Sequence, residues 1–114
     1  MFKTLYGASK ATVISPQEAK RRLSSGEPVI LLDVRTPQEY EQIHIPNSIS
    51  LPLDCLKQEV ADRIPDKDAE IIVYCLSGAR SSMACSQLIS MGYTNVSNMG
   101  GIRSWRYETV HRRG

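Results

Sequence analysis

Two short apolar runs, residues 29–32 and 71–74, dominate the hydrophobic pattern of the chain. Neither run is interrupted by a charged side chain, and this is typical of strands buried on both faces of a sheet. Shorter segments at 11–14, 48–51 and 96–98 predict three further strands. The pattern therefore indicates five strands spread along the sequence.

Two similar start signals predict helices between these strands. They are Ser15-Pro16-Gln17-Glu18 and Thr36-Pro37-Gln38-Glu39. In each, a hydroxyl side chain caps the helix, proline occupies the first helical position, and the glutamate reaches back to complete a capping box. We expect one helix from the first signal to about Ser25 and a short helix over Tyr40 from the second.

Helical spacing of apolar residues predicts two more helices, over 56–64 and 81–91, and a short helix near Trp105. Helices that alternate with strands form crossover connections, so the predicted fold is an α/β sheet covered by helices on both faces. The sequence shows no repeat or linker, and we expect residues 1–114 to form one domain.

Composition and charge narrow the function classes. The chain has 114 residues, 41% of them hydrophobic and 23% charged, which is an ordinary globular balance. A net charge of +2 argues against nucleic acid as a partner, and no apolar run is long enough to enter a membrane. Residues 106–114 are locally basic, and we expect a solvated tail there, with a patch that attracts small anions as the alternative.

The cysteine count points to free thiols. An odd number, Cys55, Cys75 and Cys85, with no CxxC pair fits neither a disulfide framework nor a zinc site. We therefore expect no metal and a reducing, cytoplasmic setting. The first ten residues contain no continuous apolar stretch, so we expect no secretory signal.

The segment that carries chemistry begins at the end of the strand over 71–74. Cys75 follows at once, and ligands of open α/β sheets bind at this carboxyl end of the strands. A tight loop between a strand and a helix can direct several backbone N–H groups at one point, where they hold an anion. Gly78 supplies the backbone freedom for such a loop, and Arg80 adds positive charge.

These features favour the thiolate form of Cys75. A free thiol with a pKa of about 8.5 is only roughly 3% ionised at pH 7, so the loop must lower the pKa to produce a nucleophile. We expect inward-pointing amides and a sulfur that solvent reaches. The alternative is that Cys75 is only a small buried residue at a strand end, as many free cysteines are.

The residues around Cys75, together with segments before and after them, resemble a rhodanese domain. The resemblance runs from about Ser15 to Trp105 in the expected order. Its first half is carried by Leu31-Leu32-Asp33-Val34-Arg35, Glu39-Tyr40 and His44-Ile45-Pro46. Its active-site loop is carried by Tyr74-Cys75-Leu76-Ser77-Gly78-Ala79-Arg80-Ser81, and its end by Gly92-Tyr93-Thr94-Asn95-Val96 and Gly100-Gly101-Ile102-x-x-Trp105.

The resemblance implies a five-stranded, mainly parallel sheet with helices on both faces. It also implies that Cys75 is catalytic: it takes sulfane sulfur from thiosulfate or a persulfide, becomes a persulfide, and passes the sulfur to a thiol or protein acceptor. No metal or organic cofactor is implied. The residues that would cradle the donor or the persulfide are Leu76, Ser77, Gly78, Ala79 and Arg80.

Two other functions remain open. Four residues separate Cys75 from Arg80, whereas related cysteine phosphatases carry five, so phosphatase or arsenate reductase activity is the weaker enzyme hypothesis. Some rhodanese-like domains are silent binding or regulatory modules. Leu76 and Ser77 stand where thiosulfate-specialised members often carry basic residues, which leaves a persulfide donor as plausible as thiosulfate.

The remaining polar residues have structural interpretations. We expect Asp33 and Arg35 to support the loop through an ion-pair network, with Arg35 pairing with Glu39. His44 is expected to form structural hydrogen bonds rather than a catalytic pair. Cys85 is expected in the core and Cys55 is also expected to be structural, with a resolving-thiol role for one of them as the alternative.

Two departures from the family pattern lie beside His44-Ile45-Pro46. Ile43 and Asn47 replace the usual glycines in that turn. Asparagine tolerates left-handed backbone whereas isoleucine does not, so we expect a locally altered backbone there. Tyr93 and Trp105 are predicted to be core anchors.

Overall fold

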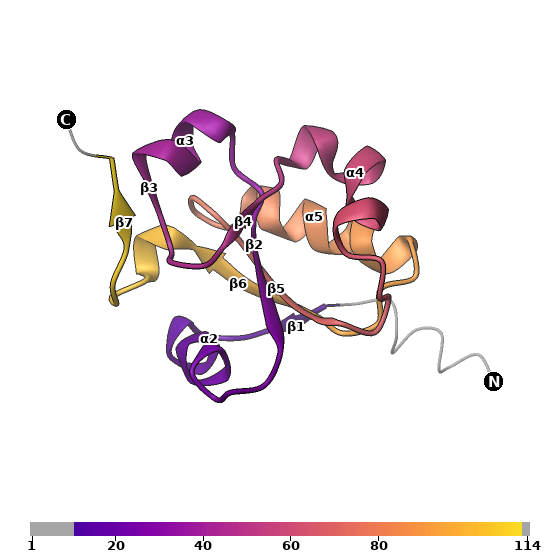
Figure 1. Ribbon diagram of the computed structural model, residues 1–114, viewed down its shortest axis with the longest axis horizontal. Helices are drawn as coiled ribbons and strands as arrows, with labels where there is room; N and C mark the ends of the chain where they lie inside the picture. The colour runs from indigo at the N-terminus through magenta and orange to yellow at the C-terminus, as the bar shows by residue number, and fades with distance from the viewer. Residues whose placement is uncertain (1–10, 113–114) are drawn as a thin grey trace.

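A computed structural model describes residues 11–112, and the first ten residues, where no secretory signal is predicted, lie outside this range (Figure 1). Its centre is a five-stranded sheet in the order β1-β6-β5-β2-β4, and every pairing within it is parallel. The strands are β1 (Thr12–Val13), β2 (Val29–Asp33), β4 (Ile49–Ser50), β5 (Glu70–Cys75) and β6 (Val96–Gly101). The predicted α/β class and five-stranded parallel sheet are confirmed.

Helices cover both faces of this sheet. α2 (Pro16–Leu23) lies on one side, and α4 (Leu56–Arg63) and α5 (Ala79–Ser90) lie on the other (Figure 1). α3 (Pro37–Gln42) lies beyond the end of β2. Two short 3₁₀ helices, η1 (Leu53–Cys55) and η2 (Ile102–Ser104), precede α4 and follow β6. Among residues 11–112, no helix has the length and apolar character needed to cross a bilayer.

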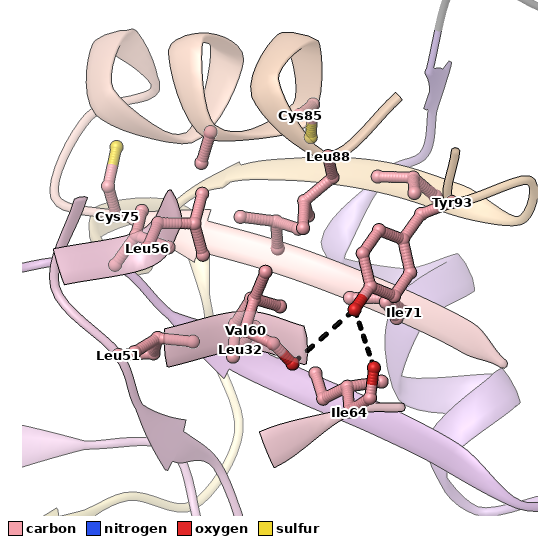
Figure 2. Close-up of a cluster of buried hydrophobic side chains, with 14 residues drawn as sticks. Leu32, Leu51, Leu56, Val60, Ile64, Ile71, Cys75, Cys85, Leu88 and Tyr93 are labelled. Atoms are coloured by element: carbon pink, nitrogen blue, oxygen red, sulfur yellow. Dashed lines mark hydrogen bonds between the residues drawn. The ribbon is translucent and has the colours of Figure 1, made fainter. Parts of the chain in front are cut away.

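Alternation along β5 distributes its side chains between two separate cores. Ile71, Val73 and Cys75 belong to the cluster beneath α4 and α5, which Figure 2 shows in close-up. Ile72 and Tyr74 belong to the cluster on the α2 side. Side chains of a strand point alternately to opposite faces, so Cys75 must lie on the α4/α5 face once the two buried runs are paired.

The two predicted helix starts differ in one respect. Thr36 and Glu39 form a complete capping box at the start of α3. Ser15 caps α2 by accepting the Glu18 N–H at 3.0 Å. The predicted return contact from Glu18 is wrong, because its carboxylate pairs with Arg21 one turn later. An exposed arginine on the same helix face offers that carboxylate a charged partner.

The carboxyl-terminal segment is more ordered than the sequence indicates. Residues 110–111 form β7 (Val110–His111), which pairs antiparallel with β3 (Ile43–His44) in a two-stranded ribbon. Both β7 residues are exposed, so the segment is solvated as expected, but it is not a free tail. Two residues make too short an apolar run to predict a strand, and only the partner strand reveals it.

The backbone near β3 explains the two replaced glycines. Asn47 adopts a left-handed conformation with φ of 68°, as expected of asparagine in this turn. Ile43 is extended, with φ of −161°, and lies in β3. An extended backbone suits a β-branched residue, so the ribbon accommodates isoleucine at a position where a turn would not.

Candidate active site

The loop after β5 is short and tightly packed. α5 begins at Ala79, two residues earlier than the predicted helix, so Ala79 and Arg80 belong to its first turn rather than to the loop. Gly78 immediately before it has φ of +120°, a conformation that side-chain-bearing residues rarely adopt. Gly101 of β6 lies directly beneath the loop, where an added Cβ would stand 2.2 Å from the Leu76 carbonyl oxygen. The loop is therefore held close to the sheet.

The Cys75 sulfur takes part in a ring of three hydrogen bonds. The Gly78 N–H donates to Sγ at 3.0 Å. The Cys75 thiol donates to the Ser81 Oγ at 3.5 Å, and the Ser81 hydroxyl donates to the Gly78 carbonyl oxygen at 3.0 Å. When the thiol ionises, the Ser81 hydroxyl can turn and donate to the sulfur instead. The predicted inward-pointing loop amide is therefore present at Gly78.

Competing influences act on the pKa of Cys75, and the net result is a lower value. Burial is the largest influence and raises the pKa, because it disfavours the charged thiolate. Hydrogen bonds from the Ser81 hydroxyl and from the backbone N–H groups of Ser81, Gly78 and Ser77 outweigh it, and the pKa falls below its ordinary value. Donors that favour the charged form lower the pKa of an acid in this way.

Cys75 is more buried than the sequence indicates. The residue is only 1% exposed, so the expectation that solvent reaches its sulfur is wrong for this conformation. Alternation along β5 places the side chain in the α4/α5 core, and Figure 2 shows it there at the end of the strand. Its cover on the solvent side includes the loop, in which Ser77 is exposed and Leu76 and Gly78 are half-buried.

Arg80 is engaged by a carboxylate. Its guanidinium donates to both oxygens of Glu39, at 2.6 Å and 3.0 Å. The hydrogen bond with Arg80 is the largest influence on Glu39 and helps to lower its pKa to about 2. The same ion pair raises the pKa of Arg80, and the charge of the nearby Cys75 thiolate adds to this effect. Arg80 therefore lies within electrostatic range of the sulfur but is already paired.

The predicted pair of Arg35 with Glu39 is wrong. The Arg35 guanidinium instead donates to the Asp33 carboxylate at 2.8 Å and to the Ile43 carbonyl oxygen at 2.6 Å. Both members of the ion pair are buried, with side chains 2% and 0% exposed. A buried ion pair needs such additional hydrogen bonds to offset its desolvation. The pair lies at the end of β2, beside the end of β5, where it can support the loop only indirectly.

A second ring of hydrogen bonds surrounds the preceding residue, Tyr74, and the sequence did not predict it. The Ile45 N–H donates to the Tyr74 hydroxyl at 3.1 Å, and the Ser48 hydroxyl donates to the Ile45 carbonyl oxygen at 2.7 Å. The Tyr74 hydroxyl lies 3.1 Å from the Ser48 Oγ and donates to it, because the Ser48 proton is already used. This ring ties the turn after β3 to the end of β5.

The other candidate residues have structural surroundings. His44 contacts the Tyr40 carbonyl oxygen through Nδ1 at 2.8 Å and stacks on the Tyr40 ring. Cys85 is 3% exposed in the α4/α5 core, and burial raises its pKa to about 12. Cys55 is half-buried in η1, and all three cysteines are free. The core position predicted for Cys85 is confirmed.

The two predicted core anchors are also buried. Tyr93 is 1% exposed and donates from its hydroxyl to the Ile64 carbonyl oxygen, a contact drawn in Figure 2. Trp105 is 8% exposed and donates from its ring N–H to the Glu108 carbonyl oxygen at 3.0 Å. Each ring therefore fills apolar space while its polar atom has a partner.

In comparison with known proteins, the profile of the rhodanese-like domain matches residues 15–108. The chain belongs to the rhodanese-like family. A sulfurtransferase from Allochromatium vinosum is 41% identical over 93 residues, which cover 81% of this rhodanese-like chain and 85% of that protein. The thiosulfate sulfurtransferase PspE of Escherichia coli is 42% identical over 72 residues, which cover 63% and 69% of the two chains.

A solved structure shares the fold. A rhodanese with anions from E. coli superposes with a TM-score of 0.69 at 37% identity and covers 73% of this chain and 98% of its own. These relatives support sulfur transfer as the general activity of this rhodanese-like domain, with a sulfur donor and a sulfur acceptor as its partners.

Proposed function

We propose that this rhodanese-like domain is a sulfurtransferase in which Cys75 is the nucleophile. The Cys75 thiolate attacks the outer sulfur of a donor, thiosulfate or a persulfide. A new S–S bond forms on Cys75, the S–S bond of the donor breaks, and sulfite or a thiolate leaves with the electron pair. An acceptor thiolate then attacks the outer sulfur of the Cys75 persulfide, and Cys75 leaves as the thiolate.

The observation that carries this proposal is the set of hydrogen bonds around the sulfur. Burial alone would keep Cys75 a neutral thiol, as it does for Cys85 in the same core. The amide of Gly78 at 3.0 Å, together with the Ser77 and Ser81 donors, lowers the pKa of Cys75 instead. The same donors can stabilise the negative charge that develops on sulfur during both transfer steps.

The residues proposed for the cradle have separate roles. Leu76, Ser77 and Gly78 form the loop that encloses the sulfur, and Gly78 supplies the closest amide. Ala79 and Arg80 form the first turn of α5, whose N-terminus favours an anion. We assign Asp33 and Arg35 a supporting role, at the end of the neighbouring strand.

Sulfur uptake requires the loop to open. With Cys75 at 1% exposure, a donor must displace the segment over Leu76–Gly78 or wait for it to move. Loops move on nanosecond to microsecond timescales, far faster than ordinary turnover, so this step need not limit the rate. Closure afterwards would shield the persulfide from solvent and from unwanted thiols. The free cysteines fit a reducing compartment, and we place the reaction in the cytoplasm.

The test compares wild type with Cys75→Ser, using thiosulfate and glutathione persulfide as separate donors. We expect wild type to gain the mass of one sulfur atom on the peptide that contains Cys75, and to transfer sulfur at least about 10³-fold faster than the variant. Cys85→Ala is the matched control and should retain sulfur transfer. Equal rates for wild type and Cys75→Ser with both donors would contradict the proposal.

The burial of Cys75 favours a second candidate function, a catalytically silent binding module. In that case the rings of hydrogen bonds would only hold the end of β5 in place. Neither donor would then load sulfur onto Cys75, and Cys75→Ser would lose only stability. The phosphatase alternative is weaker, because both arms of Arg80 that would bind an oxyanion are occupied by Glu39.

A further inference from the structure

Glu39 is an anion held in a fixed position next to the first turn of α5. Its Oε1 accepts hydrogen bonds from the Thr36 N–H at 2.9 Å, from the Thr36 hydroxyl at 3.1 Å and from Arg80 at 2.6 Å. Its Oε2 accepts from the second arm of Arg80 at 3.0 Å. The pair is partly shielded, with side chains about one-third exposed. Glu39 therefore stays charged and in place throughout the neutral pH range.

The Arg80 guanidinium is a group near Cys75 that could bind an oxyanion. Its planar pair of N–H donors matches two oxygens of a sulfonate-like group. Glu39 occupies both donors, and its charge cancels the positive charge of Arg80. The loop offers no replacement, because Leu76 and Ser77 are uncharged. Two other arginines stand beside the strand ends: Arg35 is buried against Asp33, and Arg103, whose backbone N–H donates to the Leu76 carbonyl oxygen at 3.4 Å, is exposed.

The two donor classes differ in the charge that they bring to this site. Thiosulfate carries two negative charges, and its leaving group is the sulfite dianion. A low-molecular-weight or protein persulfide brings at most one negative charge at its reacting end, and its leaving group is a thiolate. An unpaired guanidinium would favour the first donor, whereas a fixed carboxylate repels it more strongly than the second.

We infer that Glu39 determines donor specificity: by occupying Arg80, it selects against oxyanion donors such as thiosulfate and in favour of persulfide donors. This inference rests on the sulfur transfer proposed above. Glu39 acts through Arg80 and is a positioning residue rather than a catalytic one. Its removal should therefore increase one activity, whereas removal of a residue needed only for structure lowers all of them.

The test measures sulfur loading of Cys75 in single turnovers by intact-protein mass, with thiosulfate or glutathione persulfide as the donor. We expect wild type to load at least tenfold faster from the persulfide. In Glu39→Gln, loading from thiosulfate should rise about tenfold, while loading from glutathione persulfide should change less than about twofold. Glutamine still accepts the capping-box hydrogen bonds, so α3 should remain folded, as a thermal melt would verify.

Two further variants show whether the gain acts through Arg80. Glu41→Gln removes a carboxylate from the same helix, one that pairs with Arg112 rather than Arg80, and should leave both rates unchanged. Glu39→Gln combined with Arg80→Ala should lose the gain with thiosulfate. A gain that persists without Arg80, or equal gains with both donors, would overturn the inference.

The wild-type protein alone also tests the inference. Faster loading from thiosulfate than from glutathione persulfide would overturn it, whatever the stability of the variants. Failure of the inference differs from failure of the proposed function. If Cys75 loads sulfur but Glu39→Gln leaves the donor preference unchanged, only the inference fails. If Cys75 loads no sulfur from either donor, the proposed function fails and the inference fails with it.

Discussion

Tyr74 and Cys75 are neighbours at the end of β5, and each closes a ring of three hydrogen bonds on opposite faces of the sheet. The pattern is the same in both. The side chain on β5 accepts a backbone N–H and donates to a serine, and that serine donates to the carbonyl oxygen of the residue that supplied the N–H. The serine stands three residues after that residue in both rings, as Ser48 after Ile45 and as Ser81 after Gly78.

The chemical outcomes of the two rings are opposite. Burial, followed by the negative charge of Asp33, raises the pKa of Tyr74 above its ordinary value. Burial also raises the pKa of Cys75, but the Ser81 hydroxyl and the backbone N–H donors of Ser81, Gly78 and Ser77 together lower it further than burial raises it. One ring is therefore a neutral clamp and the other a site for an anion. The nearby charges and the number of donors decide between them, since burial is common to both.

The largest expected effect is the difference in reactivity between the two thiols of the α4/α5 core, Cys75 and Cys85. We expect iodoacetamide at pH 7 to modify Cys75 at least about 100-fold faster than Cys85 in the native protein. The pKa of Cys75 is lowered, whereas burial raises the pKa of Cys85, a residue of α5, to about 12, so only Cys75 has appreciable thiolate at pH 7. The rates are measured peptide by peptide by mass spectrometry. In urea the two rates should converge, and equal rates in the native state would contradict the assignment.

An intermediate effect is expected when the ring of hydrogen bonds around Tyr74 is broken. Tyr74→Phe removes the hydroxyl and leaves the buried Ile45 N–H without a partner, so it should lower the free energy of unfolding by about 1–3 kcal/mol. Urea denaturation measures this change. Sulfur loading of Cys75 per folded molecule should stay within about twofold of wild type. Tyr107→Phe, at a residue that is 36% exposed, is the control and should be nearly neutral. A large loss of loading in folded Tyr74→Phe would show that the two rings are not independent.

The smallest expected effect is the difference between replacing Ser81 and replacing Ser48, the serines of the two hydrogen-bond rings. Ser81→Ala removes a donor that favours the thiolate, so the pKa of Cys75 rises and the acid limb of the pH–rate profile moves to higher pH. Sulfur loading at pH 7 should fall about three- to tenfold and recover at higher pH, where the thiol ionises without the donor. Ser48→Ala should cost about 1 kcal/mol of stability and leave the pH profile unchanged. The same pH shift in both variants would remove the distinction between the rings.

Local patterns predicted most of the fold. The buried run over 71–74 became the central strand β5, and the apolar stretch over 11–14 became β1. The Thr36 capping box formed at the start of α3 as predicted. Such features depend on residues within one or two turns of each other, so they can be read from the sequence. Boundaries were less accurate: α5 begins two residues early, because Gly78 already provides the turn.

The site was predicted only in part. The position of Cys75 at the end of a buried strand, and the amide of Gly78 that faces it, follow from the order of elements and the length of the loop. The partner of Arg80 does not, because Glu39 is 41 residues away in sequence. In the sequence, Glu39 is fully accounted for by the capping box that starts a helix. Nothing in that pattern indicates that its carboxylate has a second partner. Arg80 pairs with Glu39 and Arg35 pairs with Asp33. Which arginine meets which carboxylate depends on which strand ends lie side by side.

The sequence by itself determined the order of strands and helices, the place of Cys75 at a strand end and the glycine that permits its loop. Those features depend on periodicity and on backbone preferences, which act between residues close in the chain. Only the tertiary structure decided that Cys75 is buried, that Tyr74 is bound to the turn after β3, and that Glu39 occupies Arg80. These contacts join residues between 6 and 41 positions apart. The longest of them arise because packing two cores against one sheet brings distant side chains within hydrogen-bonding distance.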